Sequence, residues 1–276
     1  MSIGVYMIID THMHSNVSFD AKNTREEMTL FALNLGLNKI CFTDHYDVIN
    51  EKSELVLSYE WEYARTQHEN AKKIIPQGST LQLLYGLELG NAPANFAAVT
   101  TVLDEKGLDF VIGAIHNTSL KLNGLDYYDV NYKDNLSLAI KHLEDYFSSL
   151  LMLISWGRYD TLGHLPYPLR YMRDRDGLNL QISSFREQYF EILKSNAEKG
   201  RAIEVNTDRG KDTLDDYKVL LTDWKAVGGE YITVGADAHK SIDIGKGILK
   251  AYELIQECGF KYITYYENRN PVCVKL

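Results

Sequence analysis

The segment "YMIIDTHMHSNVSFD" joins a short apolar run, Val5 to Ile9, to a group of side chains that bind metals. Asp10, His12 and His14 follow the run at spacings of two, and Asp20 comes a little later. Because strand side chains alternate with period two, His12 and His14 share one face and can bind one ion from two directions. Imidazole nitrogens mixed with carboxylate oxygens suit zinc, manganese or iron better than calcium or magnesium.

The same arrangement recurs along the chain. Seven strand-like runs, VYMIID, KICFTD, LQLLYGLELG, DFVIGAIH, YDTLGHL, AIEVNTD and YITVGAD, each end in polar side chains that can bind a metal. In order, these are Asp10, His12 and His14; Asp44 and His45; Glu88; His116; His164; Glu204 and Asn206; and Asp237 and His239. Six of the eight histidines fall in this set, which favours one shared site, and so many ligands predict two or three ions.

The other two histidines, His68 and His142, lie in helical stretches among charged residues. We interpret both as residues of solvated helix faces rather than as ligands, because an isolated histidine is more often structural.

Helix-like stretches separate most of the strand-like runs. One carries a capping box, Thr24 to Glu27, and ends at Gly36, and another carries Ser184 to Glu187 and ends at Gly200. Three more helices are expected over 135–154, 213–229 and 243–259. Strands that alternate with helices predict parallel strands joined by right-handed crossovers, and seven such units suit a barrel. The carboxyl ends of barrel strands meet at one face, so the scattered ligands are expected to converge there.

The bulk properties restrict the class of protein. A length of 276 residues suits one large α/β barrel domain, and we expect a single domain over 1–276 with a C-terminal strand or hairpin at about 260–276. The net charge of −9 argues against a nucleic-acid partner. The most apolar later segment, 150–156, is too short to span a membrane, and we expect no signal peptide and no membrane partner. The oligomeric state stays open.

The cysteines bear on the compartment. Cys41, Cys258 and Cys273 are odd in number, far apart in sequence and form no CxxC pair. The plainest interpretation is a reduced, cytoplasmic protein.

The motifs "DTHMHS", "FTDH", "GLELG", "GAIH", "GHLPYPLRY", "EVN" and "GADAH" resemble, in order and spacing, those of the PHP family, the polymerase and histidinol phosphatase family. The likeness extends from Asp10 to His239. It implies a distorted seven-stranded (β/α) barrel, similar to a TIM barrel, with the active site at the carboxyl ends of the strands. The length and Asp20 resemble the members that hydrolyse L-histidinol phosphate in histidine biosynthesis.

The resemblance implies three metal positions, to be filled by zinc, manganese or iron. The first is formed by His12, His14, Glu88 and Asp237; the second by Glu88, as a bridge, with His116 and His164; and the third by Asp20, His45 and His239. Two acids, Asp10 and Asp44, are expected either to orient ligating imidazoles or to cap strand ends. Glu204 and Asn206 are expected to orient an imidazole or to face the substrate.

The implied reaction is hydrolysis of a small phosphorylated substrate by a metal-activated hydroxide. Glu88, Asp237 and His239 are the predicted catalytic residues. His239 and a metal-bound water are alternative proton donors for the leaving group. Arg170 and Arg209 follow the fifth and sixth strands and are predicted to bind phosphate, in preference to Arg158 and Lys211.

Two loops depart from the family pattern. The stretch "NTSLKLNGLDYYD" after His116 is less aromatic than is usual, and Asp208 follows the sixth strand in place of a small residue. Three tyrosines near the first loop, Tyr127, Tyr128 and Tyr132, are expected either to form an aromatic wall for an imidazole or to serve packing. The alternatives to histidinol phosphate are therefore another phosphate ester on the same barrel, such as a sugar phosphate, nucleotide or phosphotyrosine, or a non-catalytic metal-binding module.

Overall fold

The computed structural model describes residues 7–50, 52–104, 107–211 and 213–276. Its main sheet is parallel, in the order β1-β2-β4-β5-β6-β7-β8, and short β3 pairs with β4 just beyond the end of β2. The strands are β1 (Ile9–Met13), β2 (Lys39–Phe42), β3 (His45–Asp47), β4 (Gln82–Gly90), β5 (Phe110–Ala114), β6 (Thr161–Leu162), β7 (Ala202–Asn206) and β8 (Ile232–Gly235).

The sheet curls until its first strand meets the segment after its last. The Asp237 amide donates to the His12 carbonyl oxygen at 2.8 Å, and the His14 amide donates to the Ala238 carbonyl oxygen at 2.8 Å. Met13 and Ala238 also form an isolated parallel bridge. These contacts nearly close a barrel, and they confirm the predicted distorted seven-stranded (β/α) barrel.

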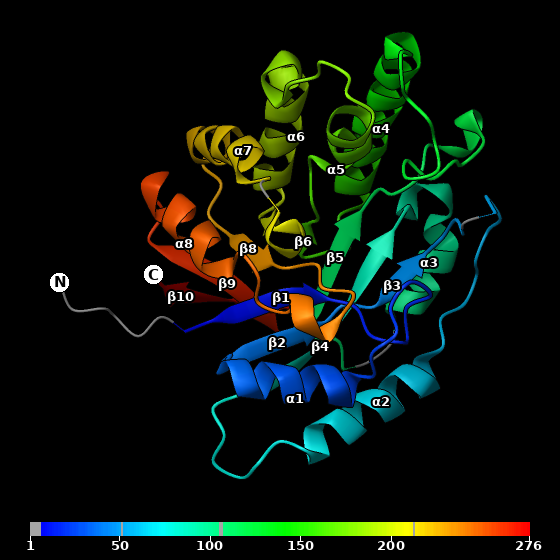
Figure 1. Ribbon diagram of the computed structural model, residues 1–276. Coiled ribbons are helices and arrows are strands. Elements are labelled where there is room, and N and C mark those ends of the chain that lie inside the picture. The colour runs from blue at the N-terminus through cyan, green and yellow to red at the C-terminus, as the bar shows by residue number, and fades with distance from the viewer. Residues whose placement is uncertain (1–6, 51, 105–106, 212) are drawn as a thin grey trace.

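Helices surround the sheet. In Figure 1, α1 and α2 lie side by side along one flank, and α4, α6 and α7 cover the opposite flank. The helices are α1 (Arg25–Leu35), α2 (Trp61–Lys73), α3 (Phe96–Leu103), α4 (Leu136–Trp156), α5 (Tyr167–Leu169), α6 (Arg186–Glu198), α7 (Leu214–Ala226) and α8 (Ile248–Glu257). None of the helices described is both long and apolar enough to cross a membrane.

The two predicted capping boxes have different outcomes. The Thr24 side chain accepts the Glu27 amide proton, and α1 ends at Gly36, whose φ is 73°, so the first prediction is confirmed. The second is wrong, because Ser184 lies inside a 3-10 turn, Ile182–Phe185, and α6 begins after it. An N-cap residue needs a non-helical backbone, which Ser184 does not have.

The first strand lies further along the chain than was expected. The strand was expected over 5–10, but β1 covers Ile9–Met13, and residues 5 and 6 fall outside the described residues. His12 is therefore a strand residue rather than a residue that follows the strand. Asp10 in β1, Glu88 in β4 and Glu204 in β7 are strand residues, as the predicted runs placed them. Polar side chains can point into the barrel near this face because the metal-ligand cluster occupies the interior there.

The expected C-terminal hairpin is present. Strands β9 (Tyr262–Glu267) and β10 (Asn270–Lys275) pair antiparallel, and the turn residues Asn268 and Arg269 both have positive φ. The hairpin is fixed to the barrel wall, where the Tyr266 hydroxyl donates to the Asp160 carbonyl oxygen at 3.2 Å.

The expected solvent exposure of two histidines is wrong. His68 and His142 are only 3% and 4% exposed. His68 shares a buried face of α2 with Ala64 and Ala71, at helical spacing, so its charged sequence neighbours lie on the other faces. His142 pairs with the Tyr132 hydroxyl at 2.9 Å. Both remain structural residues, as expected, but they belong to the core.

His68 generates a prediction about acid stability. Burial, together with the charges of Arg25 and Lys72, lowers its pKa to about 3. Below about pH 6.5 the unfolded chain binds a proton there that the folded chain does not, so the free energy of unfolding falls as pH falls. We expect His68→Phe to lose about 2 kcal/mol less than the wild type between pH 7 and pH 5. Urea unfolding of both proteins at the two pH values measures this difference, and an equal loss in both would contradict it.

Candidate metal centre

The carboxylate of Glu88 lies at the centre of the candidate site. It is only 1% exposed, and both of its oxygens face imidazole nitrogens. Its Oε1 lies 2.8 Å from His164 Nε2, and its Oε2 lies 3.1 Å from His45 Nδ1. Five histidines have a ring nitrogen within 3.4 Å of Glu88: His12, His14, His45, His116 and His164.

Asp237 faces the same cluster from the end of β8. Its Oδ1 lies 3.3 Å from His14 Nε2 and 3.6 Å from His12 Nε2. Its φ is +57°, a left-handed conformation that is uncommon for a residue with a side chain. The backbone bond from the Asp237 amide to β1 holds this conformation, which directs the carboxylate toward the histidines.

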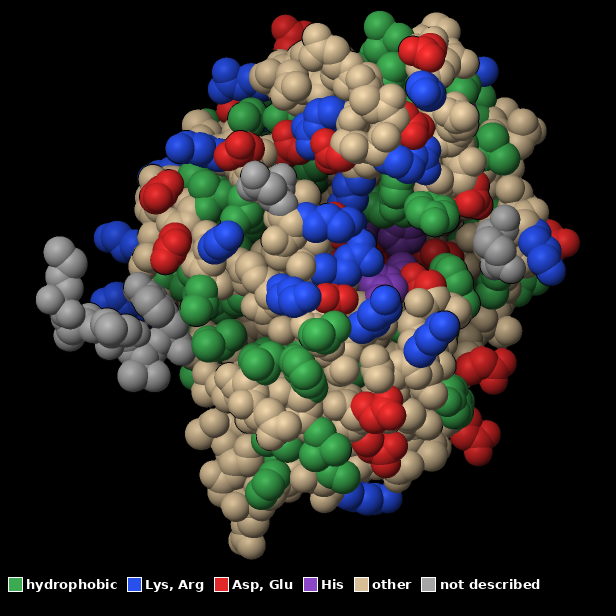
Figure 2. All heavy atoms as spheres, viewed as in Figure 1, with side chains coloured by type: hydrophobic (Ala, Val, Ile, Leu, Met, Phe, Trp, Pro, Cys, Tyr) green, Lys and Arg blue, Asp and Glu red, His purple; other side chains and the backbone are tan. Residues whose placement is uncertain are grey.

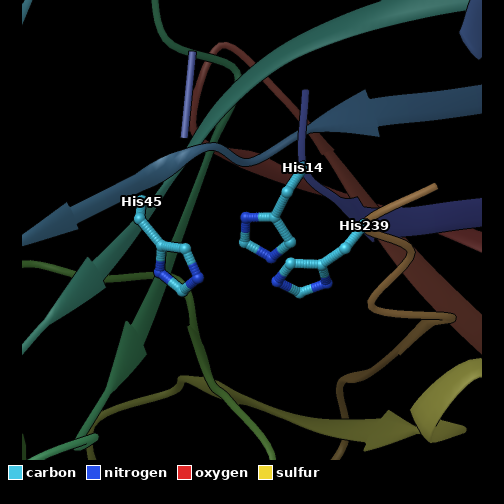
Figure 3. Close-up of side chains that lie close together, drawn as sticks. All are labelled: His14, His45 and His239. Carbon is cyan, nitrogen blue, oxygen red and sulfur yellow. The ribbon is translucent and has the colours of Figure 1, made fainter. Parts of the chain in front are cut away.

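A third group lies nearer the cavity mouth. Asp20 Oδ2 lies 2.8 Å from His239 Nε2 and 3.6 Å from His45 Nε2. Figure 3 shows His14, His45 and His239 directed toward one another, and the ring of His14 stacks on the other two at centroid distances of 4.2 and 4.3 Å. The structure therefore brings together all nine residues predicted as metal ligands.

The donor set fits metal ions. His12 Nε2 and His14 Nε2 are 3.0 Å apart, and His116 Nε2 and His164 Nε2 are 3.3 Å apart. Two ligands of a tetrahedral zinc ion, each bonded at about 2.0–2.1 Å, are separated by about 3.4 Å. Among the described residues, the buried Glu88 Oε2 has no hydrogen-bond partner. A buried carboxylate oxygen without such a partner is expected where a cation binds.

The electrostatics of the cluster favour ionised carboxylates but act in opposite directions on different imidazoles. Burial alone would raise the pKa of Glu88, but the charges of His12, His45 and His116 hold it well below its usual range. Burial, together with His45 and His239, lowers the pKa of His14 to about 4. Burial would lower the pKa of His12, His45 and His116, but the nearby carboxylates raise it, so a metal ion must displace protons from these imidazoles when it binds.

Two carboxylates that are not in the predicted ligand set hold ligand histidines in place. Glu204 Oε1 lies 2.6 Å from His12 Nδ1, so this acid orients an imidazole, which was one of its two expected roles. Asp47 Oδ1 lies 3.1 Å from His116 Nδ1 and was missed by the sequence analysis. The signal was present, because Asp47 follows His45 by two residues and so shares its strand face.

Two glycines make room for these pairs. A Cβ on Gly235 would lie 2.2 Å from the Cβ of His12, and one on Gly90 would lie 1.7 Å from Asp47 Oδ1. Both positions therefore require glycine for close approach of the backbone rather than for conformational freedom.

For Asp10 and Asp44 the contacts favour the capping alternative. Asp10 accepts the amide protons of Ala236 and Gly245, each at 2.9 Å, and so joins β1 to the segments after β8. Asp44 accepts from the Ser15 amide and pairs with the fully buried Arg25 at 2.7 Å. Neither carboxylate contacts a ligand imidazole directly.

The cluster lies at the bottom of a cavity of about 650 Å³. Figure 2 shows histidine side chains in a hollow with Lys and Arg side chains gathered along its rim. The basic residues that line it are Arg170, Arg175, Arg209, Lys211 and Lys240. Both arginines predicted to bind phosphate line this cavity; Arg158 instead pairs with Asp104, at 2.8 Å.

The acid in the unusual loop, Asp208, organises these cations. Its side chain is buried and accepts from Arg209 Nη2 at 2.6 Å and from Lys211 Nζ at 2.9 Å. Arg170 Nη1 lies 3.8 Å away and also bonds Asp237 Oδ2 at 3.3 Å. Asp208, the residue that departs from the family pattern, thus gathers three cationic side chains beside the metal-ligand cluster.

Comparison with known proteins defines the class. The PHP domain matches residues 10–208, and the chain belongs to the PHP family. A histidinol-phosphatase of Lactococcus lactis is 30% identical over 264 residues, which cover 94% of each chain.

Solved structures agree. The crystal structure of the histidinol phosphate phosphatase from Lactococcus lactis, complexed with zinc, L-histidinol and phosphate, matches with a TM-score of 0.80 and 25% identity, over 96% of this chain and 99% of that one. A Listeria monocytogenes structure, with a TM-score of 0.68 and 16% identity over 88% of this chain and 99% of that one, shares the fold.

The contact between Glu204 and His12 generates a prediction. Glu204→Gln keeps the shape but removes the charge that orients His12, so metal affinity is expected to fall by about 10–100-fold. Titration of chelated protein with zinc measures it. Glu198→Gln, on the exposed surface of α6, serves as the matched control and should leave affinity unchanged. Equal affinities for the two variants would contradict the role of Glu204.

Proposed function

We propose that this chain is a metal-dependent phosphomonoesterase that hydrolyses L-histidinol phosphate to L-histidinol and phosphate. The observation that carries the proposal is the set of five histidines around the buried Glu88, opening into a cavity with basic side chains. Its likeness along nearly the whole chain to a protein solved with zinc, L-histidinol and phosphate supports the substrate. We also propose a cytoplasmic location, in keeping with three free cysteines.

The proposed ligand sets follow the three groups of side chains. His12, His14, Glu88 and Asp237 hold one ion; Glu88, His116 and His164 hold a second; and Asp20, His45 and His239 hold a third. Zinc, manganese or iron suits these donors. When bound, such ions lower the pKa of a water and neutralise charge on the phosphoryl oxygens.

The protein's own residues position the substrate. Arg170 and Arg209 offer planar guanidinium groups to phosphate oxygens, and Asp208 keeps Arg209 at the cavity wall. Glu88, Asp237 and His239 are the proposed catalytic residues, since each lines the cavity where the phosphoryl group would lie. His239 also bonds Asp20, which fixes the direction of its Nε2.

The central test is phosphate release from L-histidinol phosphate. Chelated protein should be inactive and should recover turnover with manganese, zinc or iron. Glu88→Gln is expected to lower kcat by about 10³-fold or more, because it removes a bridging charge worth several kcal/mol. Glu144→Gln, an exposed change on α4, is the matched control and should retain activity.

The outcomes separate the alternatives. A strong preference for another phosphate ester would keep the metal site and overturn the substrate. No turnover of any ester by fully metallated protein would favour a non-catalytic metal-binding module.

The phosphate side of the cavity gives a separate prediction. Arg209→Gln should raise the inhibition constant of orthophosphate by about tenfold, because it removes a charge-assisted contact to the anion. Arg201→Gln, at a partly exposed position that does not line the cavity, is the control. An unchanged inhibition constant in Arg209→Gln would remove this residue from the phosphate site.

A further inference from the structure

The acidic residues of the cavity fall into two kinds. Five line it: Asp20, Asp47, Glu88, Asp126 and Asp237. Four of them lie within 3.3 Å of a histidine in the metal-ligand cluster. Within the described residues, Asp126 alone among the five has no ion pair with a histidine, lysine or arginine. Its carboxylate is therefore available to something that enters the cavity.

The chain around Asp126 fixes its place beside the metal cluster. Asn117 and Asp126 form a bridge, and the Tyr127 amide donates to the His116 carbonyl oxygen at 3.1 Å. Asp126 Oδ1 accepts the Tyr128 amide proton at 2.8 Å. Its other oxygen has no hydrogen bond from the described part of the chain.

Asp126 adjoins a row of aromatic rings. The ring centroids of His116 and Tyr167 are 5.2 Å apart, those of Tyr167 and Tyr171 are 5.2 Å apart, and those of Tyr171 and Tyr128 are 5.7 Å apart. The row extends from the metal cluster to Tyr128, which is 63% exposed. Aromatic faces attract cations and flat rings. Tyr127 and Tyr132 are fully buried and serve packing, so only Tyr128 of these three lines the cavity.

The charges of the cavity are divided accordingly. Arg170, Arg209 and Lys211 gather around Asp208, and Arg170 also reaches the aromatic row, with its guanidinium carbon 5.6 Å from the centre of the Tyr167 ring. Arg175 lies over the Tyr171 ring, and its guanidinium is engaged by Asp176 and by the main-chain oxygens of Tyr128 and Val130. An anion therefore finds the cations around Asp208, and a cation finds Asp126, the acid of the cavity without an ion pair among the described residues.

We propose that Asp126 and the aromatic row bind the cationic group of the alcohol part of the substrate. The proposal rests on the proposed function, in which L-histidinol supplies an ammonium group and an imidazole ring. The state of the carboxyl is consistent with this. Burial raises the pKa of Asp126 to about 6, as for a carboxyl without a cationic partner, whereas burial of Asp237 is outweighed by His12, His14, His239 and Arg170 together, which hold its pKa well below its usual range. Asp126 selects the substrate; the metal cluster and the arginines receive its phosphate.

Asp126→Asn is the variant that tests the proposal. The amide oxygen of Asn still accepts from Tyr128, so the turn is kept while the charge is lost. Calorimetry on the zinc-loaded protein measures binding of L-histidinol and of orthophosphate separately. We expect the Kd of L-histidinol to rise by about tenfold or more, as for loss of a charged hydrogen bond, while the Kd of orthophosphate and the zinc content stay unchanged.

Asp129→Asn is the matched control. Asp129 lies on the same loop and is exposed, and it does not line this cavity. It should leave both dissociation constants unchanged. An unchanged Kd for L-histidinol in Asp126→Asn, or an equal rise for both ligands, would overturn the proposal.

The result also separates this proposal from the proposed function. If the wild type fails to hydrolyse L-histidinol phosphate but hydrolyses other esters, the proposed function fails. Asp126 is then tested with 2-aminoethyl phosphate and ethyl phosphate, which differ by one ammonium group. A selective loss of kcat/KM for the aminoethyl ester in Asp126→Asn would support the role of Asp126, and equal effects on both esters would overturn it.

Discussion

The structure depends on the burial of one carboxylate, Glu88, among five imidazoles from four separate segments. A buried charge is costly unless it is fully matched, and hydrogen bonds within the protein leave Glu88 Oε2 without a partner. Metal ions held at this position would resolve the problem, because they would satisfy the carboxylate and the opposed histidine nitrogens together. Metal binding would then stabilise the same barrel face at which the proposed reaction takes place.

The barrel supplies this arrangement through register and closure. Parallel pairing of β3 with β4 places His45 beside Glu88, and β8 meets β1 so that Asp237 faces His12. Asp10, in β1, accepts the amide protons of Ala236 and Gly245 from the segments after β8 and so spans that closure. A shift of any one strand would separate ligands that are far apart in sequence, so fold and site are specified by the same contacts.

The cavity adds selectivity to a site whose metal chemistry is general. Ions and guanidinium groups treat most phosphate esters alike, since they contact only the phosphoryl oxygens. The alcohol part must be distinguished elsewhere. The loops after His116 and Asn206, which depart from the family pattern, provide Asp126 to the cavity lining and Asp208 to the cations beside it. Variation in these two loops is therefore where related barrels would differ in substrate.

The sequence by itself predicted the strand order, the barrel and the nine residues that the structure brings together, because apolar runs ending in His, Asp and Glu are a local, periodic signal and their motifs resemble those of the PHP family. The sequence could not show that Asp47 contacts His116, that Asp126 lines the cavity or that His68 is buried. Each of these features depends on which face of an element meets a distant segment. The sequence also misplaced the start of α6, where a 3-10 turn replaced the expected cap. Tertiary packing decided these features, because burial and pairing are properties of contacts between segments rather than of any one segment.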